Sequence, residues 1–247
     1  MYVYIYDDYL NKSRYNKAIN RMEIRLTDLN LNGKILRLSG IKNIKKAIEN
    51  EIKLGAKTIV AVGNNQTVNK IIGAILSADL YADFQKQTLL GIIPIGEDNS
   101  IANCFGIKNE EMACNIILAR RIEKIDLGIA NNHYFLNNAR IPSQDSLLKI
   151  SNYEIQTQKK GEIKIINLLS DKDEKKDTLK SSPHDGLLDI VIKNGKRDIS
   201  FINTKKLLIE SKHELLIDGV VKIDTPVEIG VIKNAINVIV GKERIFI

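Results

Sequence analysis

Two polar turns carry the side chains of this chain that are best placed to do chemistry. The first turn, G-N-N-Q-T at Gly63–Thr67, follows the β-branched apolar run Thr58–Val62. The second turn, G-E-D-N at Gly96–Asn99, follows a similar apolar run at Leu89–Ile95. Helical periodicity begins after each turn, and a strand-to-helix turn aims backbone N–H groups and the positive end of a helix dipole at its ligand. The two turns therefore predict a site for phosphate groups.

Alternating strands and helices position these turns in the first half of the chain. The expected strands are 2–6, 34–38, 58–62 and 89–95, and the expected helices cover about 13–29, 41–52, 67 onward, 100 onward and 110–120. Strand–helix alternation with short connections predicts a parallel sheet covered by helices on both faces. Ligands of such sheets bind beyond the carboxyl ends of the strands, which is where both turns lie.

The hydrophobic period changes after about Arg121. Two hairpins are expected, one turning at Asn131–Asn132 and one at Lys159–Gly161, and short strands follow to the end of the chain. The mixed-charge stretch Ser170–Ser182 reads as a long, mobile loop. Because helical periodicity is largely gone, the second half predicts an antiparallel sandwich or barrel. The expected fold class is thus an α/β domain followed by an all-β domain.

Composition limits the classes of protein that the chain can belong to. Its 247 residues are 44% hydrophobic and 27% charged, without an apolar run near the roughly 18–20 residues of a membrane span. The start of the chain lacks the features of an export signal, and Cys104 and Cys114 are expected to be plain thiols. These features predict a cytoplasmic protein.

The net charge of +7 permits anionic partners without naming one. The lysines are interleaved with acids, so they favour a solvated surface, with weak attraction to anionic lipid, phosphate or nucleic acid as the alternative. The sequence has neither an RNA-binding aromatic platform nor a zinc-finger spacing. Nucleic acid is therefore not an expected partner.

The residues around both turns resemble a known family. The chain reads G-N-N-Q-T-V-N-K at Gly63–Lys70 and L-G-I-I-P-I-G-E-D-N-S-I-A-N-C-F-G-I at Leu90–Ile107. This framework resembles the diacylglycerol kinase catalytic-domain family of lipid kinases, which has G-G-D-G-T-x-N-E and L-G-I-I-P-x-G-T-G-N-D-F-A-R-x-L-G-I in these places. The later segments I-D-L-G, Y-F-L-N, D-G-L-L-D-I-V-I and D-G-V-V-K-I-D-T-P-V-E-I also resemble family motifs, in the same order.

The resemblance implies a specific architecture. It predicts a phosphofructokinase-like three-layer α/β domain over residues 1–122 and an antiparallel β-sandwich over residues 123–247, with the last strand packing back on the first domain. It further implies a cleft between the domains that binds ATP with Mg²⁺, a lipid acceptor, and peripheral contact with a membrane.

The resemblance also assigns residues. The nucleotide-binding residues that it implies are Ser39, Gly63, Asn64, Asn65, Gln66, Thr67, Asn69, Gly96, Glu97, Asp98 and Asn99. Asp185 matches a structural Mg²⁺ ligand, and Asp218 is the acid that remains near the expected position of the catalytic base.

Three departures from the family pattern replace acidic residues that the resemblance would assign to catalysis or metal binding. Asn65 replaces the aspartate of G-G-D-G, Ser100 replaces that of G-N-D, and Val220 replaces the glutamate of D-G-E, the expected general base. The loss of a general base typically costs about 10²–10⁴-fold in rate. The main hypothesis is therefore a nucleotide-binding family protein with reduced or lost transfer to a lipid hydroxyl. An active kinase with substitute acids and an NAD-kinase-like phosphotransferase are the alternatives.

Overall fold

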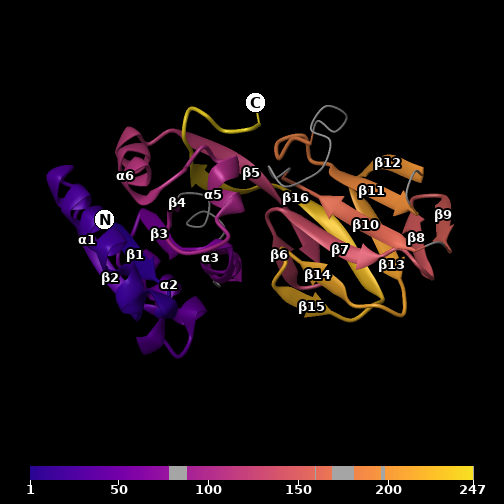
Figure 1. Ribbon diagram of the computed structural model, residues 1–247, viewed down its shortest axis with the longest axis horizontal. Helices are drawn as coiled ribbons and strands as arrows, with labels where there is room; N and C mark the ends of the chain where they lie inside the picture. Colours follow the sequence, from indigo (N-terminus) through magenta and orange to yellow (C-terminus); the bar gives the residue numbers. More distant parts are fainter. Residues whose placement is uncertain (78–87, 159, 169–180, 196–197, 247) are drawn as a thin grey trace. The chain divides into compact units, whose positions relative to one another are not determined.

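A computed structural model describes residues 1–77, 88–158, 160–168, 181–195 and 198–246 of the chain (Figure 1). These residues form two compact units. Unit 1 comprises residues 1–125 and 235–245, and unit 2 comprises residues 126–234 and Phe246. Two long strands, β5 (Ile122–Ala130) and β16 (Val227–Ile239), have residues in both units.

Unit 1 is built on a parallel sheet with the strand order β2-β1-β3-β4. Its strands are β1 (Tyr2–Tyr6), β2 (Gly33–Arg37), β3 (Thr58–Gly63) and β4 (Leu89–Pro94). Its helices are α1 (Asn16–Asp28), α2 (Ile44–Lys53), α3 (Asn65–Ser77), α5 (Ser100–Cys104) and α6 (Glu110–Ala119), with 3-10 turns η1 (Asp8–Asn11), η2 (Ser13–Tyr15) and η3 (Leu38–Gly40).

Helices packed in pairs explain why the central strands read as continuous apolar runs. Helix α1 packs against α6 and helix α2 against α3, and every residue of β3 and β4 is buried. This burial is typical of a parallel sheet covered on both faces. The end of β16 extends the sheet, because Asn237 and Val238 pair in parallel with Leu89 and Leu90. Both turns thus follow rigid, buried strands.

Unit 2 is an antiparallel sandwich. One sheet has the order β12-β11-β10-β7-β14-β15, and the other layer contains β16, β13, β8 and β9 together with the β5–β6 hairpin. The remaining strands are β6 (His133–Phe135), β7 (Asn138–Pro142), β8 (Ser146–Ile150), β9 (Tyr153–Thr157), β10 (Gly161–Ile166), β11 (Leu188–Asn194), β12 (Asp198–Thr204), β13 (Lys206–Glu210), β14 (Leu215–Ile217) and β15 (Val221–Ile223).

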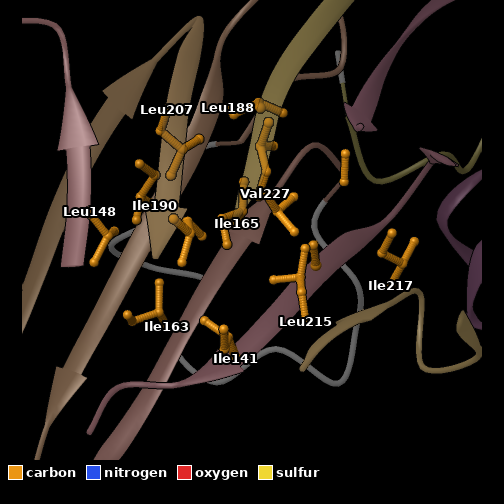
Figure 2. Close-up of a cluster of buried hydrophobic side chains, with 14 of the residues drawn as sticks. Ile141, Leu148, Ile163, Ile165, Leu188, Ile190, Leu207, Leu215, Ile217 and Val227 are labelled. Atoms are coloured by element: carbon orange, nitrogen blue, oxygen red, sulfur yellow. The ribbon is translucent and has the colours of Figure 1, made fainter. Parts of the chain in front are cut away.

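Alternate residues of these strands form one hydrophobic core. Figure 2 shows Ile163 and Ile190 of the six-stranded sheet together with Leu148, Leu207 and Val227 of the other layer. All five side chains are essentially inaccessible to solvent. Alternation of buried and accessible residues is what a sheet with one face on the core requires. The fold class that the sequence predicts, α/β followed by an antiparallel sandwich, is confirmed.

Strand pairing in unit 2 corrects one prediction. The hairpin expected around Lys159–Gly161 is wrong, because β9 pairs with β8 while β10 pairs with β7 and β11 in the other sheet. Alternating apolar residues predict that a strand has one buried face, but they do not select the partner that buries it. The loop predicted at Ser170–Ser182 lies almost entirely outside the described residues.

The structure also tests what composition predicted about the cysteines and about membrane-spanning helices. Cys104 and Cys114 are buried thiols outside any disulfide, as predicted, and burial raises the pKa of the Cys114 thiol to about 11. None of the helices in the described part of the chain combines the length and apolar character that a bilayer crossing needs.

Candidate functional site

Asn64 caps the start of α3 with its own side chain. Its Oδ1 accepts the N–H groups of Gln66 and Thr67 at 3.1 and 3.3 Å, and its carbonyl accepts the N–H of Val68 at 3.1 Å. The Asn64 N–H donates to Thr67 Oγ1 at 3.2 Å. A phosphate at a helix start would bind these same N–H groups. The N–H groups that the first turn could offer to a phosphate therefore already donate to acceptors within the protein.

Asn65 and Ser100 replace two aspartates of the family motifs, and they bind each other. The buried Asn65 side chain donates from Nδ2 to Ser100 Oγ at 2.8 Å, and its Oδ1 accepts the N–H of Ile101 at 3.0 Å. The Asn65 N–H donates to the carbonyl of Asp98 at 3.0 Å. The structure thus brings the two predicted turns together, and the two substitutions complement each other as a neutral, hydrogen-bonded pair.

Asp7 follows β1 and contacts the first turn. The Thr67 hydroxyl donates to Asp7 Oδ2 at 2.7 Å, and Lys70 Nζ lies 4.0 Å from the same oxygen. Gly63 permits this approach, because a Cβ at that position would collide with Thr67 Oγ1. A buried carboxylate at this place adds negative charge close to the N–H groups that a phosphate would need.

Tyr9 occupies the space beside the second turn. Its hydroxyl donates to the carbonyl of Ile95 at 2.6 Å, and a Cβ at Gly96, where φ is +102°, would lie 2.9 Å from the tyrosine ring. Burial and the neighbouring Asp7 carboxylate raise the pKa of the Tyr9 hydroxyl well above its ordinary value, so it stays a donor. Sequence reasoning did not assign Asp7 or Tyr9 to the site, because neither residue belongs to the motifs of the two turns.

The second turn itself presents acidic side chains to solvent. Glu97 and Asp98 are exposed, and Asp98 adopts a left-handed backbone with φ of +60°. Asn99 donates from Nδ2 to the carbonyl of Gly96 at 2.8 Å, which closes the turn. Of the other predicted nucleotide contacts, Gln66 is exposed, Asn69 is half-buried, and Ser39 is exposed on η3 after β2.

A shallow cavity of about 420 Å³ lies beside the second turn. Its lining includes Arg14, Arg21 and Lys108 as well as Glu97 and Glu110. An ion pair joins Arg21 to Glu110, and Lys108 forms an ion pair with Glu243. The cavity has the size of a small ligand, but the acids offset most of its positive charge.

Asp218 of unit 2 holds backbone with its carboxylate. Oδ2 accepts the N–H of Leu136 at 3.0 Å, and Oδ1 accepts the N–H groups of Asn137 and Asn138 at 3.0 and 2.8 Å. The side chain is buried, whereas Val220 two residues later is 36% exposed. The assignment of Asp218 as a catalytic acid stays a prediction, and the contacts shown here are structural ones.

Asp185 supplies one exposed carboxylate to the predicted magnesium site. Its Oδ1 accepts the N–H of Leu187 at 2.8 Å. The nearby Asp126, which sequence reasoning missed, is buried and accepts the N–H groups of Gly186 and Asn234, each at 2.7 Å. Within the described ranges, no group of three or more His, Cys, Asp or Glu side chains could hold a metal ion. These residues alone do not fit a magnesium site.

The sequence of this chain matches the family model of the diacylglycerol kinase catalytic domain over residues 2–130. The chain belongs to this family. The match covers all of β1 to β4 and both polar turns, so the resemblance seen in the motifs is confirmed.

Curated relatives match shorter stretches. A diacylglycerol kinase of Bacillus subtilis (strain 168) is 30% identical over 83 residues, which are 33% of this chain and 25% of that protein. A protein of Yersinia pestis (strain Pestoides F) named "Probable lipid kinase YegS-like" is 35% identical over 97 residues, 38% of this chain and 31% of its own length. The chain thus matches only about a quarter to a third of the length of these relatives.

Solved structures share the fold over nearly the whole chain. A diacylglycerol kinase structure from Bacillus anthracis str. Sterne superposes with a TM-score of 0.77 at 17% identity, covering 98% of this chain and 97% of the other. Another structure from that strain gives a TM-score of 0.80 at 15% identity, covering 99% and 98% of the two chains. At such low identity the likeness concerns the fold.

Proposed function

We propose that this chain is a lipid-kinase-family protein that still contacts ATP at the first turn but has reduced or lost phosphoryl transfer to a lipid hydroxyl. One observation carries the proposal: the five consecutive N–H groups from Asn64 to Val68 all donate to protein acceptors. Phosphoryl transfer depends on donors and cations that position the phosphates and neutralise their charge. A turn whose donors are already used can do this only after its own hydrogen bonds break.

Charge supports the same proposal. Asp7 contacts Thr67 of the first turn, and Glu97 and Asp98 are exposed on the second turn, so ATP phosphates would meet like charge that Lys70 offsets only in part. In the family pattern Asn65 and Ser100 would be carboxylates able to interact with Mg²⁺, but here they are neutral and bind each other. We therefore propose that nucleotide binding is weak and depends little on Mg²⁺, and that it uses accessible groups such as the exposed Gln66 and the half-buried Asn69.

An activity assay on the whole chain tests the proposal. Labelled ATP is incubated with diacylglycerol or a sphingoid base in mixed micelles, and we expect no phospholipid product even at high protein concentration. The variant Asn65→Asp/Val220→Glu restores two of the missing acids. We expect activity to appear in this double variant, with each single variant as its control. Turnover by the unmodified chain would contradict the proposal.

Nucleotide binding is measured separately. Titration calorimetry with ATP and ADP, with and without Mg²⁺, should give weak binding that Mg²⁺ changes little. The variant Asn64→Gly removes the side chain that caps α3, so it should bind ATP more tightly than the unmodified chain. Lack of any nucleotide binding, in both proteins, would remove the ATP part of the proposal and leave the rest standing.

A fully active kinase is the second candidate, and the retained carboxylate of Asp218 favours it. This alternative gives Asp218 the role of general base for the lipid hydroxyl. If the unmodified chain makes product, Asp218→Asn should abolish turnover at a temperature where circular dichroism shows that this less stable variant is still folded. Product formation that survives Asp218→Asn would assign the base role elsewhere.

A further inference from the structure

The positive charge of the molecule is concentrated in one short segment. Residues 33–57, which contain β2, η3 and α2 (Figure 1), are here called the basic segment. It has seven cations, Lys34, Arg37, Lys42, Lys45, Lys46, Lys53 and Lys57, against two acids, Glu49 and Glu51. The segment thus supplies five of the seven net positive charges of the chain, and the other 222 residues supply two.

The fold turns these cations toward solvent. Ile48, Glu51 and Ile52 are the buried residues of α2, so the opposite side of this helix carries Lys46 and Lys53. Lys46, Glu49 and Lys53 have the spacing i, i+3, i+7, and they form a stripe along the exposed side. The ion pairs of Lys34 with Glu51 and of Lys53 with Glu49, each at 2.6 Å, use both acids of the segment.

Exposed apolar side chains accompany the cations. Leu54 at the end of α2 is 70% exposed, and Ile35 on β2 is 47% exposed. Strand β2 is also an edge of its sheet, since it pairs with β1 and with no other strand of the described chain. A leucine this exposed buries apolar area when it enters the boundary between lipid headgroups and acyl chains.

The composition of the basic segment favours binding to lipid over binding to nucleic acid. Residues 33–57 contain no Phe, Tyr or Trp, so the aromatic stacking that single-stranded nucleic acid uses is missing. Cations beside isolated aliphatic side chains are the pattern of proteins that bind an anionic bilayer surface. Family membership adds that related proteins act on lipids, which are found in bilayers.

We propose that the basic segment docks this protein on an anionic lipid bilayer, with Lys42, Lys46 and Lys53 at the headgroups and Leu54 in the interface. The proposal rests on membership of the lipid-kinase family, but it does not require phosphoryl transfer. The tests below measure membrane binding and not phosphoryl transfer or nucleotide binding. A negative result would therefore overturn the docking proposal without bearing on the proposed function.

Vesicle co-flotation of the whole chain gives the first test. We expect binding to vesicles of phosphatidylcholine with about 30% phosphatidylglycerol, loss of that binding at high salt, and little binding to phosphatidylcholine alone. Each cation at a bilayer surface contributes about fivefold in partitioning, so Lys42→Gln/Lys46→Gln/Lys53→Gln should weaken binding about 100-fold.

A matched variant controls for overall charge. Lys149→Gln/Lys206→Gln/Lys222→Gln removes the same charge from exposed ion pairs of unit 2, and it should bind nearly as the unmodified chain does. Equal losses in the two triple variants would overturn the proposal. So would equal binding to neutral and anionic vesicles.

The absence of tryptophan from the chain allows a direct optical test. Leu54→Trp places a single tryptophan on the basic segment, and Tyr153→Trp places one at a site of similar exposure, 72% against 70%, on β9 of unit 2. Anionic vesicles should shift the emission of Leu54→Trp to shorter wavelength and leave that of Tyr153→Trp unchanged. The opposite pattern would overturn the proposal. Binding of a labelled single-stranded oligonucleotide, without vesicle binding, would do so as well.

Discussion

Two regions of this molecule, the paired turns of unit 1 and the segment around Asp218 in unit 2, occupy places where the family pattern carries acids, and they have changed in different ways. In unit 1 the acids are gone, and Asn64, Asn65 and Ser100 bind the turn to itself and to α5. In unit 2 Asp218 keeps its carboxylate, which binds three N–H groups of another segment, while the neighbouring Val220 faces solvent. The comparison teaches that the Asp218 carboxylate has a structural role of its own, which does not depend on a glutamate at position 220.

Removal of the Asp218 carboxylate should have the largest effect on stability. Asp218→Ala leaves three buried N–H groups without their acceptor, and each such loss costs about 1–3 kcal/mol. We expect the free energy of unfolding, from urea titration followed by circular dichroism, to fall by at least about 3 kcal/mol. The exposed Asp224 provides the control, as Asp224→Ala should change it little. A stable Asp218→Ala protein would show that this carboxylate is kept for another reason.

Removal of the Asn64 cap on α3 should have the second-largest effect on the free energy of unfolding. Asn64→Ala removes the acceptor of the Gln66 and Thr67 N–H groups, and the loss of such a cap costs about 0.5–2 kcal/mol. The same urea titration should show this decrease, and Asn64→Ser should recover most of it because serine also caps helices. If Asn64→Ala and Asn64→Ser were equally stable, the cap would not be what holds the turn closed.

The contact between Asn65 and Ser100 should give a smaller, coupled effect. In a double-mutant cycle with Asn65→Ala and Ser100→Ala, we expect a coupling free energy of about 1 kcal/mol, since the two side chains form a buried hydrogen bond. Strictly additive losses would mean that the two substitutions do not support each other, and the contrast between the turns of unit 1 and the Asp218 region of unit 2 would weaken.

Val220 should be the least sensitive position. Because its side chain is exposed, Val220→Glu should change the free energy of unfolding by less than about 0.5 kcal/mol. Val227→Glu, which buries a carboxylate in the core of the same unit, provides a strongly destabilised reference for the urea titration. A large loss in Val220→Glu would show that this valine has a packing role.

Local patterns predicted much of the fold because they report burial. The apolar runs of β3 and β4 follow from their position in a covered parallel sheet, and the amphipathic residues of α2 follow from its one buried side. The same patterns could not choose between partners for β9 and β10, since either sheet buries alternate side chains equally well.

The position of the candidate site was predictable from the sequence, but the hydrogen bonds among its residues were not. Motif spacing located the two turns and the missing acids, because those are properties of neighbouring residues. The bond between the Tyr9 hydroxyl and the Ile95 carbonyl joins residues 86 positions apart, and the bond between Asn65 and Ser100 joins residues 35 apart. Pairings this distant depend on how strands and helices pack.

The sequence by itself determined the family, the order of strands and helices in unit 1, and the loss of the expected carboxylates at Asn65, Ser100 and Val220. Only the tertiary structure decided that Asn64 caps the first turn, that Asp7 and Tyr9 lie against the two turns, and that Asp218 holds the backbone of residues 136–138. The physical reason is that the sequence fixes the side-chain types, whereas the fold selects which acceptor each donor meets: within the turn for Asn64, and across distant segments for Asp7, Tyr9 and Asp218.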